Sequence, residues 1–549
     1  MIATTSVPAD HDYEFRPEDR PSFPGGPFAP PHPPLRRLAY AAIGLWIGAT
    51  ATFANATVTV NITNLSGEYA AYVAELSWLP AIYVAANSCT NTMLVKARAR
   101  FSMPNVMQAL LLVYILVAAM QFFVPGGFAA EAVLRFVSGI VAGGMTTTSI
   151  FYLLQVVPAK ARAVAMVTGM GMTQLGTPLA RLLPVDLLSS HGWFGQHCIE
   201  LATGLTTLTL ITLLPLPPTP RWRCFQPLDF VTVALLLPAM LLICGVLNRG
   251  RLAWWTDTPW LGVDLAVAIP LLTAAIVVEA LRERPLIQIG WIGTREFLGF
   301  AVIALLMRFA LAEQTYGAVG LLTAGNLDND QLRQLFGWVI VSMLAGIVTC
   351  VLTLSEQAIP KQVIVASLAI AAGAWMDSHT NSLTRPEQLY LSQSLIGFGT
   401  CLFIGPTMAH GIIKVIRLGP DYFVTLVVVF SMTQNIGGLV GSAFLGSYQT
   451  IAARSHFLEL AQRMPVGDAQ VANRIAGSTR ALAGAVADPA LRTQQGGASL
   501  AASMTREANV LAYNDVARLV WRLALGNALL VVFLVLISAI RPTRRPEPA

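Results

Sequence analysis

The stretch that decides the fold is Met172-Thr173-Gln174-Leu175-Gly176, which recurs 260 residues later as Met432-Thr433-Gln434-Asn435-Ile436-Gly437. A second pair of stretches has the offset 258, because Ser138-Gly139-Ile140-Val141-Ala142-Gly143-Gly144 is echoed by Ile396-Gly397-Phe398-Gly399-Thr400. Two matches in the same order and at nearly the same offset indicate a duplicated unit. Duplicated halves of apolar helices are a transporter architecture, with the substrate site between the repeats near the middle of the membrane.

The composition excludes a water-soluble body. Only 12% of the 549 residues are charged, against roughly 25% in soluble proteins, while 55% are hydrophobic. The net charge of +6 would indicate nucleic acid if the basic residues formed one patch, but they are spread along the chain. The six cysteines have no paired spacing for zinc, redox chemistry or a disulfide framework. We therefore expect no metal and no nucleic-acid partner.

Fourteen apolar runs are long enough to cross a bilayer as helices, which takes about 20 residues each. We therefore expect an all-α polytopic membrane protein, in which the lipid bilayer is itself a partner. The runs lie at 38–63, 74–95, 104–123, 131–155, 162–186, 197–216, 229–247, 261–281, 297–318, 335–354, 362–376, 389–409, 421–447 and 521–540.

The Lys and Arg residues set the direction of these spans, because basic loops stay on the cytoplasmic side. With both termini inside, the predicted cytoplasmic segments hold 20 of the 35 basic residues, and the short outer loops hold four. This bias predicts that both termini are cytoplasmic.

The repeat divides the fourteen spans into six, two and six. We expect a Pro-rich disordered cytoplasmic tail at 1–37, because the first 34 residues hold nine prolines and almost no apolar periodicity. A first six-helix bundle is expected at 38–216 and two inserted helices with their linkers at 217–296. The second six-helix bundle is expected at 297–545, including a periplasmic segment at 448–520.

Several motifs have the form of one family's signatures. They are Thr57-Val58-Thr59-Val60-Asn61, Trp78-Leu79-Pro80-Ala81-Ile82-Tyr83, Leu134-Arg135-Phe136-Val137-Ser138-Gly139, Pro158-Ala159-Lys160-Ala161-Arg162, Gly176-Thr177-Pro178-Leu179, and the linker Arg284-Pro285-Leu286. Over nearly all of 38–545 the chain resembles the fourteen-span drug/proton antiporter branch of the major facilitator superfamily. The resemblance implies the major facilitator fold and proton-driven export of small amphipathic compounds by alternating access. It also implies a bacterial inner membrane.

Two motifs depart from that family. An acidic residue normally stands five positions before Asn61, and here that position is Ala56. The loop after the second span normally carries a Gly and an Asp, but residues 92–100 contain neither. Whether and where the chain carries protons is therefore left open.

Three charged side chains fall within predicted spans, where a charge is costly and usually faces a cavity or a partner. Arg135 lies in the outer part of the fourth span, Arg308 near mid-depth in the ninth, and Glu313 five residues further on. Five residues place Glu313 roughly 140° around the helix from Arg308, so the two are poor partners for each other.

Each of these side chains has two interpretations. Arg135 is a fixed charge whose partner changes between the inward-open and outward-open states, or it snorkels to outer head groups or caps carbonyls. Glu313 is a proton carrier, since a buried carboxyl group holds a proton more readily, or it is solvated near the interface. Arg308 lines a cavity and meets an anionic substrate, or it has a structural role.

Amide side chains complete the predicted substrate and proton pathway. Gln174 and Gln434 occupy equivalent places in the two halves, so they are predicted to face the cavity, and Asn61 is a further candidate. Hydrogen bonding between helices explains amides within spans equally well.

Small residues are predicted to serve helix packing and gating. Gly139, Gly143 and Gly437 have the small-residue spacing that lets helices approach closely and slide past each other. Pro178 removes one backbone hydrogen bond, which predicts a bend in the fifth span. Packing alone also accounts for these residues.

The long segment before the last span reads as amphipathic helical pieces, with loop breaks expected near 465–468 and 495–497. One interpretation is an outer cap over the cavity mouth. The resemblance implies another, a docking surface for a periplasmic adaptor protein that leads substrate toward an outer membrane channel.

The substrate class stays open at the level of sequence. The first expectation is a secondary active exporter of small amphipathic or drug-like compounds, and the alternative is an exporter of aromatic or other organic acids with atypical or no proton coupling. A membrane-embedded transferase or a transporter-like receptor is more distant, because no His/Asp cluster, paired carboxylates or phosphate-binding Gly-Lys-Ser/Thr loop is visible. We therefore expect neither an enzyme nor a cofactor.

Overall fold

The computed structural model describes residues 19, 21, 25–123, 127–221, 224–282, 285–418, 421–465 and 467–540. Every regular element in these ranges is a helix, as membranes require of a chain without a closed barrel. By length and composition, eleven helical stretches in the described part could each cross a bilayer. The expected all-α polytopic fold is confirmed, and the number fourteen stays a prediction.

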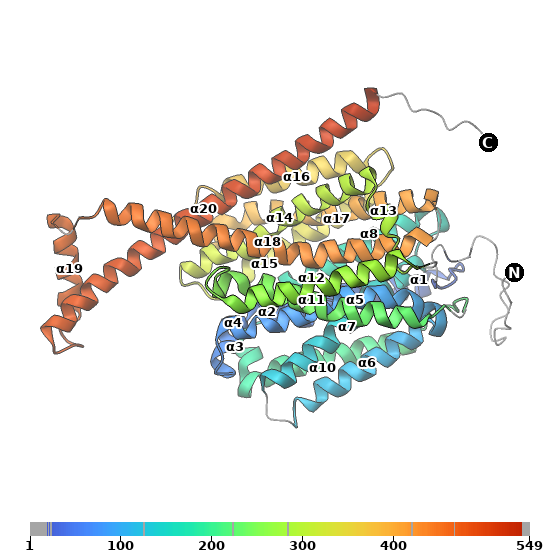
Figure 1. Ribbon diagram of the computed structural model, residues 1–549, viewed down its shortest axis with the longest axis horizontal. Coiled ribbons are helices and arrows are strands. Elements are labelled where there is room, and N and C mark those ends of the chain that lie inside the picture. Colours follow the sequence, from blue (N-terminus) through green and yellow to red (C-terminus); the bar gives the residue numbers. More distant parts are fainter. Residues whose placement is uncertain are drawn as a thin grey trace.

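The helices before residue 216 form one bundle, drawn in blue to teal in Figure 1. Their bounds are α1 Pro34–Thr50, α2 Phe53–Val60, α3 Ile62–Glu68, α4 Val73–Leu76, α5 Trp78–Phe101, α6 Met103–Met120, α7 Phe128–Leu154, η2 Ala159–Ala161, α8 Arg162–Met172, η3 Thr173–Leu175, α9 Gly176–Ala180 and α10 Val185–Leu213.

The helices after residue 288 form a second bundle, and two helices lie between the bundles in the sequence. The inserted pair is α11 Pro227–Ala253 and α12 Pro259–Ala280. The second bundle contains α13 Ile289–Ile292, α14 Arg295–Ala324, α15 Arg333–Leu352, α16 Ile359–Asp377, η4 Pro386–Leu389, α17 Tyr390–Leu418, α18 Asp421–Gln462, α19 Ala469–Ala481 and α20 Pro489–Ile540.

Three expected spans are helical without being among the eleven. They correspond to α5, to the series α8, η3 and α9, and to α10. Polar side chains lower the hydropathy of α5, which carries Asn87 and Asn91, and of α10, which carries Gln196 and Glu200. The fifth span is divided by the 3-10 turn η3, so neither of its pieces is long enough alone.

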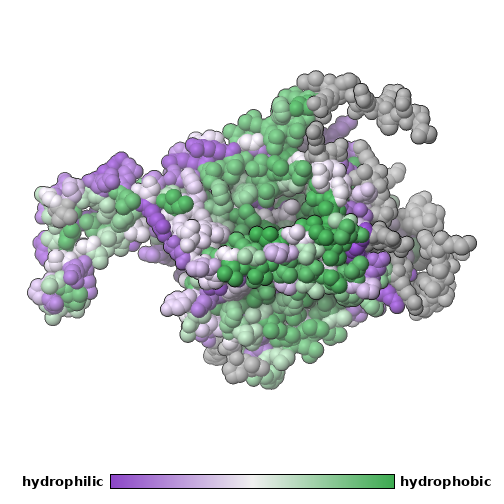
Figure 2. Space-filling model, in the orientation of Figure 1, coloured by the Kyte–Doolittle hydropathy of each residue, from purple (hydrophilic) through white to green (hydrophobic). Residues whose placement is uncertain are grey.

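The inserted pair lies on the seam between the bundles. In Figure 1, α11 and α12 run along the boundary between the first bundle and the second. α11 packs against α5 on one side and α18 on the other, while α12 packs mainly against α11. On the face shown in Figure 2, apolar residues cover the middle of the bundle and polar ones gather toward its two ends, as expected for a bundle that crosses a bilayer.

The two ends of the bundle are distinct. The start of α1 and the end of α20 lie at one end, which we name the terminal end (Figure 1). At the opposite end, α18 and α20 continue beyond the other helices and are joined through α19. We name this the hairpin end.

The predicted position of one loop break in the hairpin is wrong. The chain leaves α18 after Gln462, as predicted, but the second break lies between Ala481 and Pro489, and α20 runs unbroken through residues 495–497. A Cβ built at Gly496 would come within 2.3 Å of the Thr479 hydroxyl oxygen. The glycine therefore allows α19 to pack closely on α20 instead of forming a turn.

The end of the expected tail packs against the first bundle. Gln155 donates from Nε2 to the Phe28 carbonyl oxygen at 3.1 Å, and the Phe28 amide donates to the Pro218 carbonyl oxygen at 3.1 Å. α1 begins at Pro34 and not at Leu38, as suits a proline in the first turn of a helix. Except for residues 19 and 21, the tail before residue 25 lies outside the described residues, as do residues 541–549.

Candidate functional site

A central cavity of about 210 Å³ lies between the two bundles. Its walls come from α5, α7, α8, η3 and α9 of the first bundle and from α14, α17 and α18 of the second. Amide and hydroxyl groups, apolar side chains and two arginines share the lining. The main lining residues are Thr52, Asn87, Asn91, Arg98, Phe151, Met166, Met170, Gln174, Arg308, Met408, Phe430, Gln434 and Asn435.

Two interrupted helices meet at the cavity wall. The break between α1 and α2 lies at residues 51–52, and the Thr52 hydroxyl donates to the Thr173 carbonyl oxygen in η3 at 2.9 Å. The turn η3 precedes Pro178, whose ring nitrogen cannot donate to a carbonyl one turn earlier. Interrupted helices expose backbone groups only where these line a cavity, so the bend expected at Pro178 coincides with the site.

Three predicted site residues line this cavity, namely Gln174, Gln434 and Arg308. The two glutamines approach it from η3 and α18, as their equivalent places in the repeat predicted. Gln174 donates to the neighbouring Thr173 hydroxyl at 3.3 Å. The side-chain oxygen of Gln434 is buried without a hydrogen-bond partner among the described residues.

Arg308 reaches the cavity across the glycines of α18. Its Nε donates to the Gln434 carbonyl oxygen at 2.9 Å. A Cβ at Gly437 would lie 3.1 Å from the Arg308 Cγ, and one at Gly438 would lie 2.9 Å from its Nη2. The small residues predicted to serve packing therefore also make room for a cation.

Sequence reasoning missed Arg98, which it assigned to a cytoplasmic loop. α5 continues to Phe101, beyond the predicted end of that span at 95, and carries Arg98 into the cavity lining. The side chain is only 2% exposed, with its guanidinium carbon 5.2 Å from the centre of the Phe151 ring. Its Nε and Nη2 make no hydrogen bond to any described residue.

Amide groups join the bundles across the cavity. Asn91 of α5 donates to the Ser431 hydroxyl of α18 at 2.8 Å, and Asn435 of α18 donates to the Asn87 side-chain oxygen at 3.2 Å. At the hairpin end, Arg181 donates from Nη1 to the Asn329 side-chain oxygen at 3.0 Å. This third hydrogen bond also links the first bundle to the second.

Arg135 lies in a separate buried cluster within the first bundle. It forms an ion pair with Glu131 of the same helix at 2.8 Å and another with Glu200 of α10, and it donates to the Ala54 carbonyl oxygen at 2.7 Å. Its exposed fraction is 0%, so the arginine does not snorkel to the head groups. The i,i+4 spacing of Glu131 could have indicated the first partner, whereas nothing in the sequence indicates Glu200.

Glu313 belongs to a carboxyl pair in the second bundle. It is 1% exposed and accepts a hydrogen bond from Gln393 Nε2 at 3.3 Å, and the same nitrogen donates to Asp377 at 2.7 Å. In the described part of the chain, no Lys or Arg forms an ion pair with either carboxyl group. Glu313 is therefore not a solvated interfacial residue, and its partner Asp377 was missed because it closes an ordinary apolar run.

Asn61 and the two glycines of the fourth span lie outside the central cavity. Asn61 joins α2 to α3, and its side-chain nitrogen donates to the Thr57 carbonyl oxygen one turn earlier at 2.9 Å. A Cβ at Gly139 would lie 2.5 Å from the Tyr83 carbonyl oxygen, and one at Gly143 would lie 3.4 Å from Thr90. Both glycines bring α7 close to α5.

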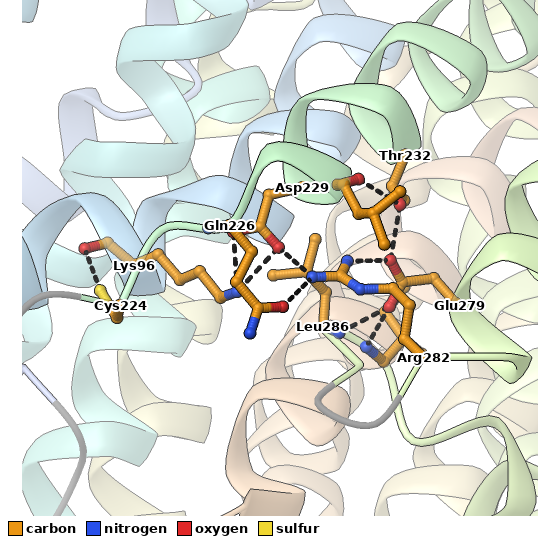
Figure 3. Close-up of polar contacts among 10 residues, drawn as sticks. Lys96, Cys224, Gln226, Asp229, Thr232, Glu279, Arg282 and Leu286 are labelled. Atoms are coloured by element: carbon orange, nitrogen blue, oxygen red, sulfur yellow. Dashed lines mark hydrogen bonds and ion pairs between the residues drawn. The ribbon is translucent and has the colours of Figure 1, made fainter.

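An ion-pair cluster ties the inserted pair to α5 at the terminal end (Figure 3). Lys96 contacts both carboxylate oxygens of Asp229 at 2.7 and 2.8 Å. Arg282 lies between Asp229, at 2.6 Å, and Glu279, at 2.7 Å. Lys96 lies in the part of α5 that continues past the predicted end of the second span, and it takes its acidic partner from the inserted helix α11.

Comparisons with known proteins agree with this architecture. The family described as sugar (and other) transporters matches residues 40–226. The colistin resistance protein EmrB of Acinetobacter baumannii is 21% identical over 348 residues, which are 60% of this chain. The chain spans 64% of the length of that relative.

Solved transporters share the fold at low sequence identity. A bacterial homologue of the human drug peptide transporters PepT1 and PepT2 has a TM-score of 0.54 and 10% identity, over 92% of this chain and 98% of that one. The proton:xylose symporter XylE, of the major facilitator superfamily, has a TM-score of 0.50 and 11% identity, over 89% and 94%.

Two bundles around a central cavity define a multi-pass membrane transporter. The chain shares the fold of major facilitator transporters, and its first half is similar in sequence to transporters of this kind.

Proposed function

We propose that the protein is a secondary active exporter of small amphipathic or drug-like compounds, and that it moves them without chemical conversion. The observation that carries the proposal is the central cavity, which lies between the bundles and mixes amide groups with Phe and Met side chains. Such mixed linings bind compounds that are partly apolar. The relative's association with colistin resistance supports the outward direction.

Alternating access follows from the contacts between the bundles. Arg181 and Asn329 hold them together at the hairpin end, so release of substrate on that side requires this hydrogen bond to break. We place the terminal end in the cytoplasm and the hairpin end in the periplasm of a bacterial inner membrane. The distribution of Lys and Arg residues supports that orientation.

Proton coupling is assigned to the carboxyl pair of Glu313 and Asp377. Both accept from one amide nitrogen, and neither has a described cation as partner. Two negative charges at such a site repel each other, so a single proton shared by the pair stabilises it. The pair thus offers a proton site in the second bundle of a chain that has Ala56 where the family carries an acid.

Arg135 is assigned the role of a fixed charge that links helices. Glu131 and Glu200 both contact it, so this cluster holds two carboxylates for one cation. Separation of Arg135 on α7 from Glu200 on α10 would leave one carboxylate without its cation, which makes the cluster a second place for a proton during the cycle.

Substrate uptake into inverted vesicles tests the function. A strain with and without the gene is first screened for growth on lipophilic cations and on weak aromatic acids. Compounds that separate the strains are then supplied to vesicles with an imposed pH gradient. We expect gradient-driven accumulation in vesicles that contain the protein, and the absence of accumulation for every such compound would contradict the proposal.

Variants of the carboxyl pair test the coupling. Glu313→Gln and Asp377→Asn are expected to abolish the response to the pH gradient while substrate exchange without a gradient continues. The matched control is Glu459→Gln, whose carboxylate lies on the exposed part of α18. Equal gradient-driven rates in wild type and Glu313→Gln would rule out Glu313 as the proton carrier.

The protruding hairpin is assigned to a periplasmic adaptor that leads substrate to an outer membrane channel. Exposed apolar side chains on α18, among them Ile451 (57% exposed) and Leu458 (61% exposed), support a partner there. Replacement of Leu458 by Glu should reduce resistance in cells and leave vesicle transport unchanged. Loss of both activities, or of neither, would contradict this role.

A further inference from the structure

We propose that the central cavity binds organic monoanions with a compact aromatic body, and that Arg98 and Arg308 bind the anionic group. This inference rests on the proposed transport function and narrows its substrate class.

The charge of the cavity is the first observation. Arg98 and Arg308 both line it, whereas no Asp or Glu is found among its described lining residues. Neither arginine forms an ion pair with a carboxylate in the described part of the chain. A buried cation without a counter-ion is costly. An anion that enters the cavity therefore stabilises the site, whereas a cation is repelled by both arginines.

Both arginines have guanidinium nitrogens that donate to no described residue. Arg98 is 2% exposed, and its Nε and Nη2 have no described acceptor. Arg308 donates through Nε to the Gln434 carbonyl oxygen, and no described residue accepts from its two terminal nitrogens. Guanidinium groups with free nitrogens bind the paired oxygens of a carboxylate or sulfonate well.

The apolar wall and the size of the cavity define the rest of the ligand. Phe151, Phe430, Met166, Met170 and Met408 line the space beside the arginines. Aromatic and thioether side chains favour flat apolar groups. A volume of about 210 Å³ lies below the usual range of ligand pockets, about 300–1,000 Å³, so a body of one or two rings is favoured.

The two cations lie at different depths. Arg98 lies three residues before the last residue of α5, at the terminal end, whereas Arg308 lies near the middle of α14. A substrate anion that arrives from the terminal end therefore meets Arg98 first and Arg308 second. This order matches export from the terminal side toward the hairpin end.

Three probes with the same two-ring body separate charge from shape. They are 2-naphthalenesulfonate, the cation N-methylquinolinium and neutral 2-naphthalenemethanol. Binding is measured by calorimetry on the full-length chain in lipid nanodiscs, with empty nanodiscs as the blank. We expect the sulfonate to bind at least tenfold more tightly than the cation.

Arginine variants identify the residues. Arg308→Gln and Arg98→Gln are each expected to weaken sulfonate binding at least tenfold and to leave binding of the neutral probe within twofold. Arg308→Lys keeps the charge but loses the paired geometry, so its loss should be smaller than that of Arg308→Gln. Arg454→Gln is the matched control, because Arg454 contacts Trp254 far from the cavity.

The outcomes separate this inference from the proposed function. Equal binding of sulfonate and cation, or full sulfonate affinity in both Gln variants, would overturn the anion site even when vesicles still transport other compounds. If a Gln variant loses the neutral probe as well, Arg308→Lys decides, since an affinity no better than that of Arg308→Gln would refute a charge contribution. Failure of vesicles to transport any probe, with sulfonate binding intact, would refute transport alone.

Discussion

Replacement of Asp229 by Asn tests the ion-pair cluster that fastens the inserted helices to the first bundle. The Asp229 carboxylate is fully buried. It accepts hydrogen bonds from Lys96 at 2.7 and 2.8 Å, from Arg282 at 2.6 Å and from the backbone N–H of Gln226 at 2.8 Å. Asparagine keeps one oxygen but removes the negative charge. Among the described residues, Arg282 then keeps Glu279 as its carboxylate partner and the Gln226 side-chain oxygen as a neutral acceptor, and Lys96 has no anion.

The expected loss follows from the burial of the three partners. Removing one member of a buried ion pair costs about 3–5 kcal/mol. The Lys96 side chain is 18% exposed, so water offsets part of that cost, and we expect about 2–4 kcal/mol. Glu459→Gln provides the control, because its pair with Arg463 is more than half exposed on both sides and is worth less than about 1 kcal/mol.

Thermal unfolding in detergent with a thiol-reactive dye measures this loss. Cys89, Cys244, Cys350 and Cys401 are buried, so they react only when the bundles open. A double-mutant cycle with Lys96→Met isolates the pair, and we expect a coupling energy of about 1–3 kcal/mol. An unchanged unfolding temperature for Asp229→Asn, or a coupling energy near zero, would refute the view that this cluster holds α11 against α5.

Three further substitutions test the buried ion pairs and the close packing of the helices. Glu200→Gln leaves Arg135 with one carboxylate and should destabilise the first bundle by about 3–5 kcal/mol, with a lower unfolding temperature in the same assay. Gly139→Val places a side chain against the backbone of α5 and should cost about 1–3 kcal/mol, whereas a wild-type unfolding temperature would contradict the close approach. Gly438→Ala should displace the guanidinium of Arg308 and weaken sulfonate binding several-fold with little change in stability, and unaltered affinity would show that the arginine adapts.

Periodicity and composition predicted the membrane architecture well, because each membrane-spanning helix is a continuous apolar run that its own stretch of sequence reveals. Gln174 and Gln434 were expected to face one cavity because they hold equivalent positions in the repeat, and Arg308 because it lies at mid-depth in its span. All three line the central cavity. Each of these inferences needed only the position of a residue within its own helix.

Partners from other helices could not be predicted in this way. Glu200 lies 65 residues from Arg135, and Asp377 lies 64 residues from Glu313, so no local spacing joins either pair. Arg98 was missed because a basic residue after an apolar run normally marks the membrane surface, whereas α5 continues as a helix to Phe101. Which face a helix end presents depends on its neighbours, and the sequence of that helix alone does not contain this information.

The unbroken length of α18 has a mechanical consequence. This single helix carries Gln434 at the cavity wall and ends at Gln462 in the hairpin, roughly 40 Å away along its axis. A pivot of about 10° at the cavity therefore sweeps the far tip through roughly 7 Å. A small rotation of α18 at the central cavity is therefore amplified at its far end. A protein bound to that end would respond to whether the cavity holds substrate.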